Sequence, residues 1–296
     1  MLDLKMNIHF IHKEEKMDLL WDIRVVLDLF LGGIGIGAFV LASILYLSDA
    51  QKYKLICKTG FIIAPIFVAV GLVFLLLEIG RPFQAATMMF FVNPTSVMSW
   101  GGFLQAIFMV LSVYVLYNVY KNQEQSRAVL VFAMFFALAV GIYHGALLTS
   151  IGQAAWNGAL LTLFLTTSLV SGTLLTLFLS NRLQKTTWHN SFISLVLVTL
   201  VFLSMVSLLG WLLAMGTQSV ESKEALAYLC SHFTVWIWIA FIFAMAIPMV
   251  VYVKSLITQK ELSSFEFYIT SLGAVVGVFV LKYVVVYLGQ LDYLVK

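Results

Sequence analysis

Charged residues are scarce in this sequence. Only 10% of its 296 residues are Asp, Glu, Lys or Arg, whereas 62% are hydrophobic. A water-soluble enzyme needs far more polar surface, so the composition excludes that class and predicts an integral membrane protein. The net charge of +3 is too small to indicate nucleic-acid binding.

Cysteine is nearly absent, and the two that occur, Cys57 and Cys230, form no metal or iron–sulfur motif. The topology inferred below puts them at opposite membrane faces, where they cannot pair. A transmembrane b-type haem needs two facing imidazoles. The candidates are His144 and His232, both near one face, so two haems are excluded and one is disfavoured. We therefore expect no haem or metal in this chain.

Long apolar runs are what the sequence has instead. Eight of them are long enough to cross a hydrocarbon core of about 30 Å. They fall at residues 24–48, 56–79, 97–120, 128–149, 157–180, 191–214, 229–254 and 265–288. The predicted fold class is all-α integral membrane, with eight transmembrane helices.

Basic residues concentrate in alternate connections between these runs. Lys and Arg are frequent in four of them, at residues 49–58, 118–127, 181–190 and 254–264. The other connections carry only Arg81 and Lys223. The positive-inside rule then places the first set in the cytoplasm and both termini outside it. The first 20 residues mix both charge signs, unlike a signal peptide, and predict a short surface segment.

A faint internal repeat relates the first and fifth runs. Trp21, an LFL triplet and Gly37 recur as Trp156, LFL and Gly172. Four helices separate the two occurrences, so both halves would run in the same direction. We expect a single membrane domain over residues 1–296, made of two four-helix bundles at 24–149 and 157–288.

Residues 74–102 form the most unusual stretch of the chain. The carboxylate Glu78 lies in the last turn of an apolar helix, which Gly80, Arg81 and Pro82 should end. A new helix should begin after Asn93, as its N-cap, with Pro94 at the first helical position. The uncharged segment between them would lie in the membrane interface. The alternative is a plain hairpin loop in which Glu78 and Arg81 pair.

Ionisable residues inside the spans are few, and intramembrane charges indicate function. Asp28, Glu78, His144 and Lys282 all fall in the outer third of the membrane in this topology, and so does His232. Each also has a structural interpretation. Asp28 could pair with Arg24, His144 could be a satisfied core residue, Lys282 could snorkel, and Tyr143 could belong to an aromatic belt. Their clustering favours a shared functional pocket.

The run GGIGIGA at 32–38 is not a dinucleotide-binding loop, because its surroundings are transmembrane. Close helix packing by small residues explains it. A flat groove for a planar ligand, at Gly32 and Gly33, is the functional alternative.

Four segments carry a family resemblance: LEIGRP (77–82), NPTSVMSWGG (93–102), LFLGGIGIGA (29–38) and the stretch 143–172 that begins YHGALLTS. Together they resemble the NrfD/PsrC family, the membrane subunits of polysulfide-reductase-type complexes. The resemblance implies a haem-free, eight-helix subunit in a bacterial or archaeal cell membrane that binds menaquinone or another quinone. It also implies an iron–sulfur subunit docked on the outer face, linked to a molybdopterin or multihaem catalytic subunit.

The resemblance also implies site residues. Family members place a polar residue of helix 1 and a tyrosine of helix 4 at the quinone, and Asp28 and Tyr143 occupy these places here. Family members also carry an acidic residue before a Gly-Arg-Pro sequence, and Glu78 matches it in this chain. Helix 1 contains no histidine in this chain, which departs from the family pattern.

The expected chemistry is quinol oxidation or quinone reduction. Asp28 and His144 would act as bases and Tyr143 as a hydrogen-bond donor to the ring. Glu78 and Arg81 would carry protons to the outer face or bind the partner, and Lys282 would supply a counter-charge. Arg24 would join them in binding the quinone.

Two other functions remain open on the sequence. One is a secondary transporter, although a mid-membrane polar site and paired broken helices are missing. The other is a membrane anchor without quinone chemistry.

Overall fold

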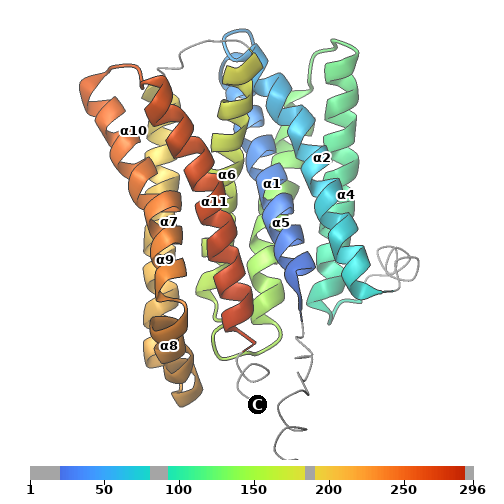
Figure 1. Cartoon of the computed structure of the whole chain (residues 1–296). Helices are drawn as coiled ribbons and strands as arrows, with labels where there is room; N and C mark the ends of the chain where they lie inside the picture. Colours follow the sequence, from blue (N-terminus) through green and yellow to red (C-terminus); the bar gives the residue numbers. More distant parts are fainter. Residues whose placement is uncertain (1–20, 81–92, 184–190, 291–296) are drawn as a thin grey trace, which may run out of the picture.

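The computed structural model describes residues 21–80, 93–183 and 191–290, and within these ranges the chain is helical, without any β-strand. Figure 1 shows the elements in order. They are α1 (Ile23–Asp49), α2 (Lys54–Ile79), α4 (Val97–Tyr120), α5 (Arg127–Thr149), α6 (Ala159–Leu183), α7 (Ser191–Thr217), α8 (Val220–His232), α9 (Thr234–Phe241), η1 (Ile242–Ala246), α10 (Ile247–Thr258) and α11 (Ser264–Leu288).

The predicted fold class is confirmed. In the described ranges, eight helical segments are long and apolar enough to cross a membrane, and they match the eight predicted runs to within a few residues. Which side of the membrane the termini occupy stays a prediction. The surface segment at 1–20, the interfacial segment at 83–92 and the residue Arg81 lie outside the described residues.

The seventh span begins later than predicted. Residues 215–228 were expected to be a connection and the span to start at 229, but α8 occupies Val220–His232 and the span starts at Thr234. The Ser219 hydroxyl caps α8 by accepting a hydrogen bond from the Ser222 N–H at 3.1 Å. Charged side chains in its first turns make α8 too polar to continue the span.

A π-helical turn, η1, interrupts the same span between α9 and α10. Pro248 follows it and has no N–H to donate to the carbonyl four residues earlier, which accounts for the change of hydrogen-bond register. The facing helix α11 approaches closely at this point. A Cβ added at Gly277 would lie 2.5 Å from the backbone N of Ala244.

The entry to α4 also differs from expectation. Ser96, not Asn93, is the N-cap, and its hydroxyl accepts a hydrogen bond from the Ser99 N–H at 3.3 Å. Asn93 instead accepts a hydrogen bond from the Thr95 N–H at 3.1 Å, which forms a turn before the helix. Gly80 ends α2 as predicted, in the left-handed conformation with φ of 69°.

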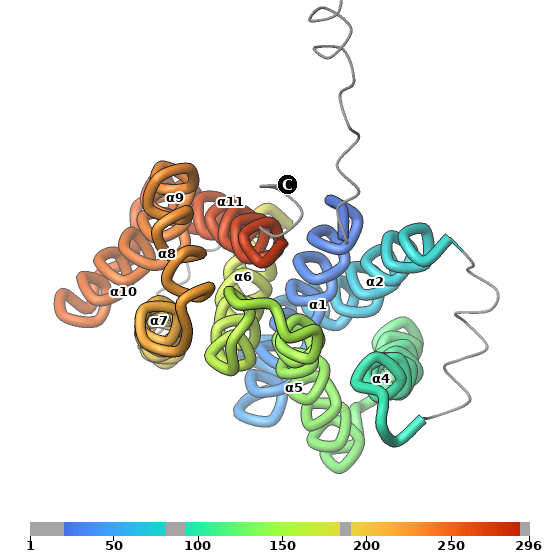
Figure 2. The backbone as a smooth tube through the Cα atoms, turned by 90° about the horizontal axis from the view of Figure 1, so that it is seen from below, coloured from blue at the N-terminus to red at the C-terminus, as the bar shows by residue number. Residues whose placement is uncertain are grey.

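Helix α1 lies at the centre and contacts α2, α5, α6 and α11 (Figure 2). It packs closely against α6, where Gly37 meets Gly172. A Cβ added at Gly172 would lie 2.6 Å from the Cα of Gly37, and one at Gly37 would overlap the carbonyl oxygen of Ser168. Small residues therefore set the distance between the two helices, as expected inside a membrane.

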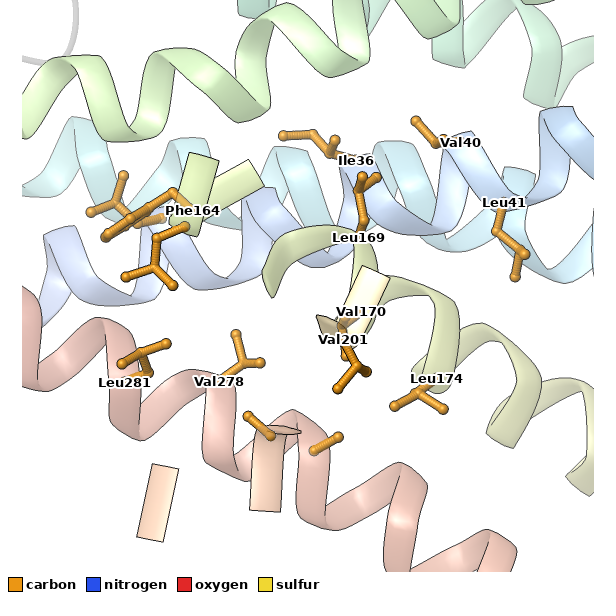
Figure 3. Packing of buried hydrophobic residues seen from close by; sticks show 14 of the residues in the cluster. Ile36, Val40, Leu41, Phe164, Leu169, Val170, Leu174, Val201, Val278 and Leu281 are labelled. Atoms are coloured by element: carbon orange, nitrogen blue, oxygen red, sulfur yellow. The ribbon is translucent and has the colours of Figure 1, made fainter. Parts of the chain in front are cut away.

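The buried core continues between α1, α6 and α11. Figure 3 shows Ile36 of α1, Phe164 and Leu169 of α6, and Val278 and Leu281 of α11 packed in this region. Lipid tails are as apolar as these side chains, so close packing rather than escape from water holds the helices together. This core fixes the three helices that surround the polar residues described below.

Matching positions of the predicted repeat contact each other. Trp21 and Trp156 stack, with ring centroids 5.3 Å apart and an interplanar angle of 22°. Asp22 and Asn157, which follow them, each accept a hydrogen bond from the backbone N–H two residues further on. A two-fold axis between α1 and α6 would give these contacts. We propose on this basis that the predicted two-bundle organisation is correct.

Candidate functional site

Asp28 is buried on α1, with 2% of its surface exposed. Its Oδ1 has no hydrogen-bond partner among the described residues. Helix α2 packs against it at Gly71, where an added Cβ would lie 3.1 Å from that oxygen. An unpartnered carboxylate oxygen in an apolar interior is costly, so packing alone does not explain Asp28.

Arg24 does not pair with Asp28, contrary to the structural interpretation considered above. Its guanidinium lies 2.7 Å from an Asp22 carboxylate oxygen and 2.8 Å from one of Glu78, and it also donates to the Leu77 carbonyl. Asp22 is the N-cap of α1 and Glu78 lies in the last turn of α2, so both are nearer the helix ends than Asp28. The Arg24–Glu78 pair thus joins α1 to α2 at the end of the bundle.

Asp22 was not singled out in the sequence. Burial disfavours its charge, but hydrogen bonds from the backbone and side chain of Arg24 outweigh this effect, so the pKa of Asp22 lies below its usual value. The alternative considered above, in which Glu78 pairs with Arg81, stays untested because Arg81 lies outside the described residues.

His144 is completely buried on α5. Neither Nδ1 nor Nε2 has a hydrogen-bond partner in the described part of the chain, so it is not the satisfied core histidine considered above. Its ring faces Gly32 of α1, where an added Cβ would lie 3.2 Å from Cε1 and 3.4 Å from Nε2. Gly32 follows Asp28 by four residues, one helical turn. Asp28 and His144 therefore border the same turn of α1.

Tyr143 precedes His144 and points toward α4. Its ring fills the space over Gly101, and a Cβ at Gly101 would overlap the ring atoms. The glycine of the MSWGG motif therefore makes room for the tyrosine. The Tyr143 and His144 ring centroids are 6.2 Å apart, so the two side chains border neighbouring parts of one region.

Lys282 of α11 approaches the same turn of α1 from another side. Its Nζ donates hydrogen bonds to the Leu29 carbonyl at 2.7 Å and to the Ser168 hydroxyl at 3.0 Å. A Cβ at Gly33 would lie 2.6 Å from Nζ. The snorkelling interpretation is wrong, because only 1% of Lys282 is exposed and its ammonium ends among α1, α6 and α11.

The structure thus brings most of the predicted residues together around residues 28–33 of α1, which span less than two helical turns. Sequence reasoning missed Gly71, Gly101 and Ser168, which make room for or bind this cluster. The available signals were an isolated glycine within an apolar run for Gly71 and the glycine pair of the MSWGG motif for Gly101. His232 lies apart from the cluster, stacked on Tyr228 and hydrogen-bonded to Ser231.

A separate apolar cavity of about 540 Å³ lies among α7, α8 and α9. None of the predicted site residues lines it. The lining residues are Met205, Leu208, Leu209, Leu212, Leu226, Leu229, Cys230, Thr234, Ile237, Trp238 and Phe241. With almost no polar lining, it offers no group for acid–base chemistry.

The turn at residues 28–33 gathers a carboxyl, an imidazole and an amine, with a phenol nearby, in an apolar surrounding. Such groups exchange protons with a bound molecule. Over the described residues, no three His, Cys, Asp or Glu side chains gather closely enough to hold a metal ion. Fold and site define a multi-pass, all-helical membrane protein with a buried cluster of titratable side chains near one end of the bundle.

Comparison with known families makes the assignment more specific. The family model described as "Polysulphide reductase, NrfD" matches residues 12–293, nearly the whole chain. The chain therefore belongs to the NrfD family. It is a polysulfide-reductase-type membrane subunit and a multi-pass protein of the cell membrane.

Named relatives agree with this membership. The polysulfide reductase C subunit of Wolinella succinogenes is 26% identical over 94% of this chain and 96% of its own length. Protein NrfD of Escherichia coli is 25% identical over 92% of this chain and 96% of its own length. The Hdr-like menaquinol oxidoreductase integral membrane subunit of Archaeoglobus fulgidus is 24% identical, over 39% of this chain and 29% of its own length.

Proposed function

We propose that this chain oxidises menaquinol, or reduces the quinone, as the membrane subunit of a respiratory oxidoreductase complex. The single observation that carries the proposal is the buried pair of Asp28 on α1 and His144 on α5, which border the same part of α1 and both have unpartnered polar atoms. A hydroxyl-bearing ring is a ligand that would satisfy both. The relative named as a menaquinol oxidoreductase subunit supports this class of ligand.

In the oxidising direction, quinol loses two protons and two electrons. Asp28 accepts the proton of one hydroxyl and His144 that of the other, and Tyr143 donates a hydrogen bond to a ring oxygen. Gly32 leaves room for the His144 ring, and Gly33 leaves room for the Lys282 ammonium. In the reverse direction the same groups return the protons.

Protons reach the surface through the end of the bundle where Arg24 bridges Asp22 and Glu78, helped by Arg81. The electrons pass to an iron–sulfur subunit docked at that end, which we assign to the outer face of the membrane. That subunit links onward to a molybdopterin or multihaem catalytic subunit. Electrons and protons then leave toward one face, so turnover moves no net charge across the membrane.

Substitution of the two bases tests the proposal. Asp28→Asn and His144→Ala should each lower quinol oxidation by the purified complex by about 10²- to 10⁴-fold, the range of general-base contributions. Matched controls are Asp49→Asn, at the opposite end of α1, and His232→Ala, outside the cluster. Subunit composition should stay unchanged in all four. Normal turnover in either base variant would remove that residue from the mechanism.

The charge balance offers a second test. The complex reconstituted in liposomes should oxidise quinol without generating a membrane potential. A response of a potential-sensitive dye to turnover would contradict the proposal that electrons and protons leave toward the same face of the membrane.

A further inference from the structure

Lys282 is a buried charged residue that takes no direct part in the proton transfers proposed above. Two of its three donor hydrogens are used by the Leu29 carbonyl and the Ser168 hydroxyl, and its Nζ lies 5.1 Å from the Phe164 ring centroid. Neutral side chains could make such bonds at lower cost, because burying an ammonium in a membrane is expensive. The charge itself therefore needs a partner.

Asp28 is the carboxylate closest to Lys282 along α1. The ammonium binds the carbonyl of Leu29, the residue that follows Asp28, and it interacts electrostatically with both Asp28 and His144. No direct ion pair joins Lys282 to a described carboxylate, so the two charges interact over a longer distance than in an ion pair.

The other helices around this turn offer no competing charge. α2 presents Gly71 and α6 presents Ser168, while α5 brings His144 and the phenol of Tyr143. Arg24, the nearest cation on α1 itself, is occupied by Asp22 and Glu78. Among the described residues, Lys282 is thus the positive charge available to Asp28.

We propose that Lys282 is a positioning residue for the base Asp28. Its ammonium is the fixed counter-charge that keeps Asp28 ionised, and so able to take a proton from a quinol hydroxyl. In that step the hydroxyl O–H bond breaks, a new O–H bond forms on Asp28, and Lys282 keeps its charge. The two electrons go to the iron–sulfur partner. This inference rests on the proposed function.

A double-mutant cycle tests the inference in the purified complex. Lys282→Met should lower kcat for quinol oxidation at least about tenfold, with KM changed by less than about twofold. Adding Asp28→Asn to it should cause no loss beyond that of Asp28→Asn alone, because both substitutions disable the same base. Lys254→Met, which removes an exposed lysine paired with Glu266 near the opposite end of the bundle, is the matched control.

Thermal stability gives a readout that does not need quinone. Lys282→Met and Asp28→Asn should each lower the unfolding midpoint, because each leaves one buried charge uncompensated. The double variant should recover part of the loss. If the two effects simply add, in stability and in turnover, Lys282 only fastens α11 to α1 and α6. A wild-type complex that does not oxidise quinol would refute the proposed function. The unfolding midpoints of the two single variants and the double variant would still show whether Lys282 and Asp28 interact.

Discussion

α1 and α6 pack in matching ways but carry different chemistry. Counted from the stacked Trp21 and Trp156, the position of Asp28 in α1 corresponds to Leu163 in α6. Leu163 belongs to the apolar core. Its carbonyl accepts a hydrogen bond from the Thr167 hydroxyl at 2.6 Å, so the polar groups here are satisfied within α6. Asp28, in contrast, has an oxygen without a described partner.

The comparison separates what the fold requires from what the chemistry requires. Stacked tryptophans, capped helix starts and facing glycines occur in both helices. The titratable groups gather around α1. The one contribution from the second group of helices is Lys282, which donates to the Leu29 carbonyl of α1 and to the Ser168 hydroxyl of α6. Substitutions at matched positions can therefore test whether scaffold and site are separable.

The largest effect is expected at the contact between the two helices. Gly37→Leu and Gly172→Leu should each prevent assembly, because the new side chain would meet the backbone of the other helix. The measurement is the yield of monodisperse protein by size-exclusion chromatography in detergent. Gly210→Ala is the control, since its Cβ would make an ordinary contact at 3.8 Å. Tolerance of one leucine but not the other would break the equivalence of α1 and α6.

A second effect should appear in activity rather than assembly. Gly101→Ala places a methyl group where the Tyr143 ring lies and must move the ring. We expect quinol oxidation to fall by about 10²-fold, as expected for a misplaced site residue, while the complex still assembles. Tyr143→Phe, which keeps the ring in place and removes the hydroxyl, separates loss of the donor from loss of position. Unchanged turnover in Gly101→Ala would place Tyr143 outside the site.

The stacked pair predicts a smaller difference in stability. Trp156→Phe should cost more than Trp21→Phe, because Trp156 also donates its Nε1–H to the Val285 carbonyl at 2.8 Å. The excess should be about 1 kcal/mol, the net value of a typical hydrogen bond. Chemical denaturation in detergent micelles measures it. Equal costs would mean that the hydrogen bond adds nothing to the stacking.

The smallest effect is expected at the partly exposed ion pair. Arg24→Gln should change stability by less than about 1 kcal/mol, because its side chain is 41% exposed and surface ion pairs contribute little. Quinol turnover should fall only a few-fold, most clearly at low ionic strength, where salt screens the charge of Arg24 least. Stopped-flow measurement across salt concentrations tests this. A loss of turnover as large as that caused by Asp28→Asn would indicate that Arg24 takes part in the proton transfers.

Much of the fold follows from the sequence because apolar length decides which segments can span a membrane. The start of the seventh span could not be placed, since the apolar Leu226, Tyr228 and Leu229 obscure the separate helix that Ser219 caps. The π turn at Ile242–Ala246 had Pro248 as its only signal. Both details depend on local hydrogen bonding that hydropathy does not report.

The sequence could predict which buried titratable side chains lie near one another, but not what each of them pairs with. Placing intramembrane charges at similar depth brought Asp28, His144 and Lys282 into one group. Their distances depend on how the helices rotate about their axes, which Gly71 and Gly33 determine by letting neighbours approach. The pairing of Arg24 with Glu78 needed the register of α2 against α1. Periodicity cannot supply that register in helices that are apolar on every side.

Gln290 joins the first and last helices of the bundle. Its side-chain carbonyl accepts a hydrogen bond from the Trp21 N–H at 2.8 Å, and its amide donates to the Trp21 carbonyl at 3.0 Å. The first and last turns of the fold are therefore neighbours. We expect the protein to tolerate circular permutation, with the natural ends joined by a linker and new ends opened in the connection between α5 and α6.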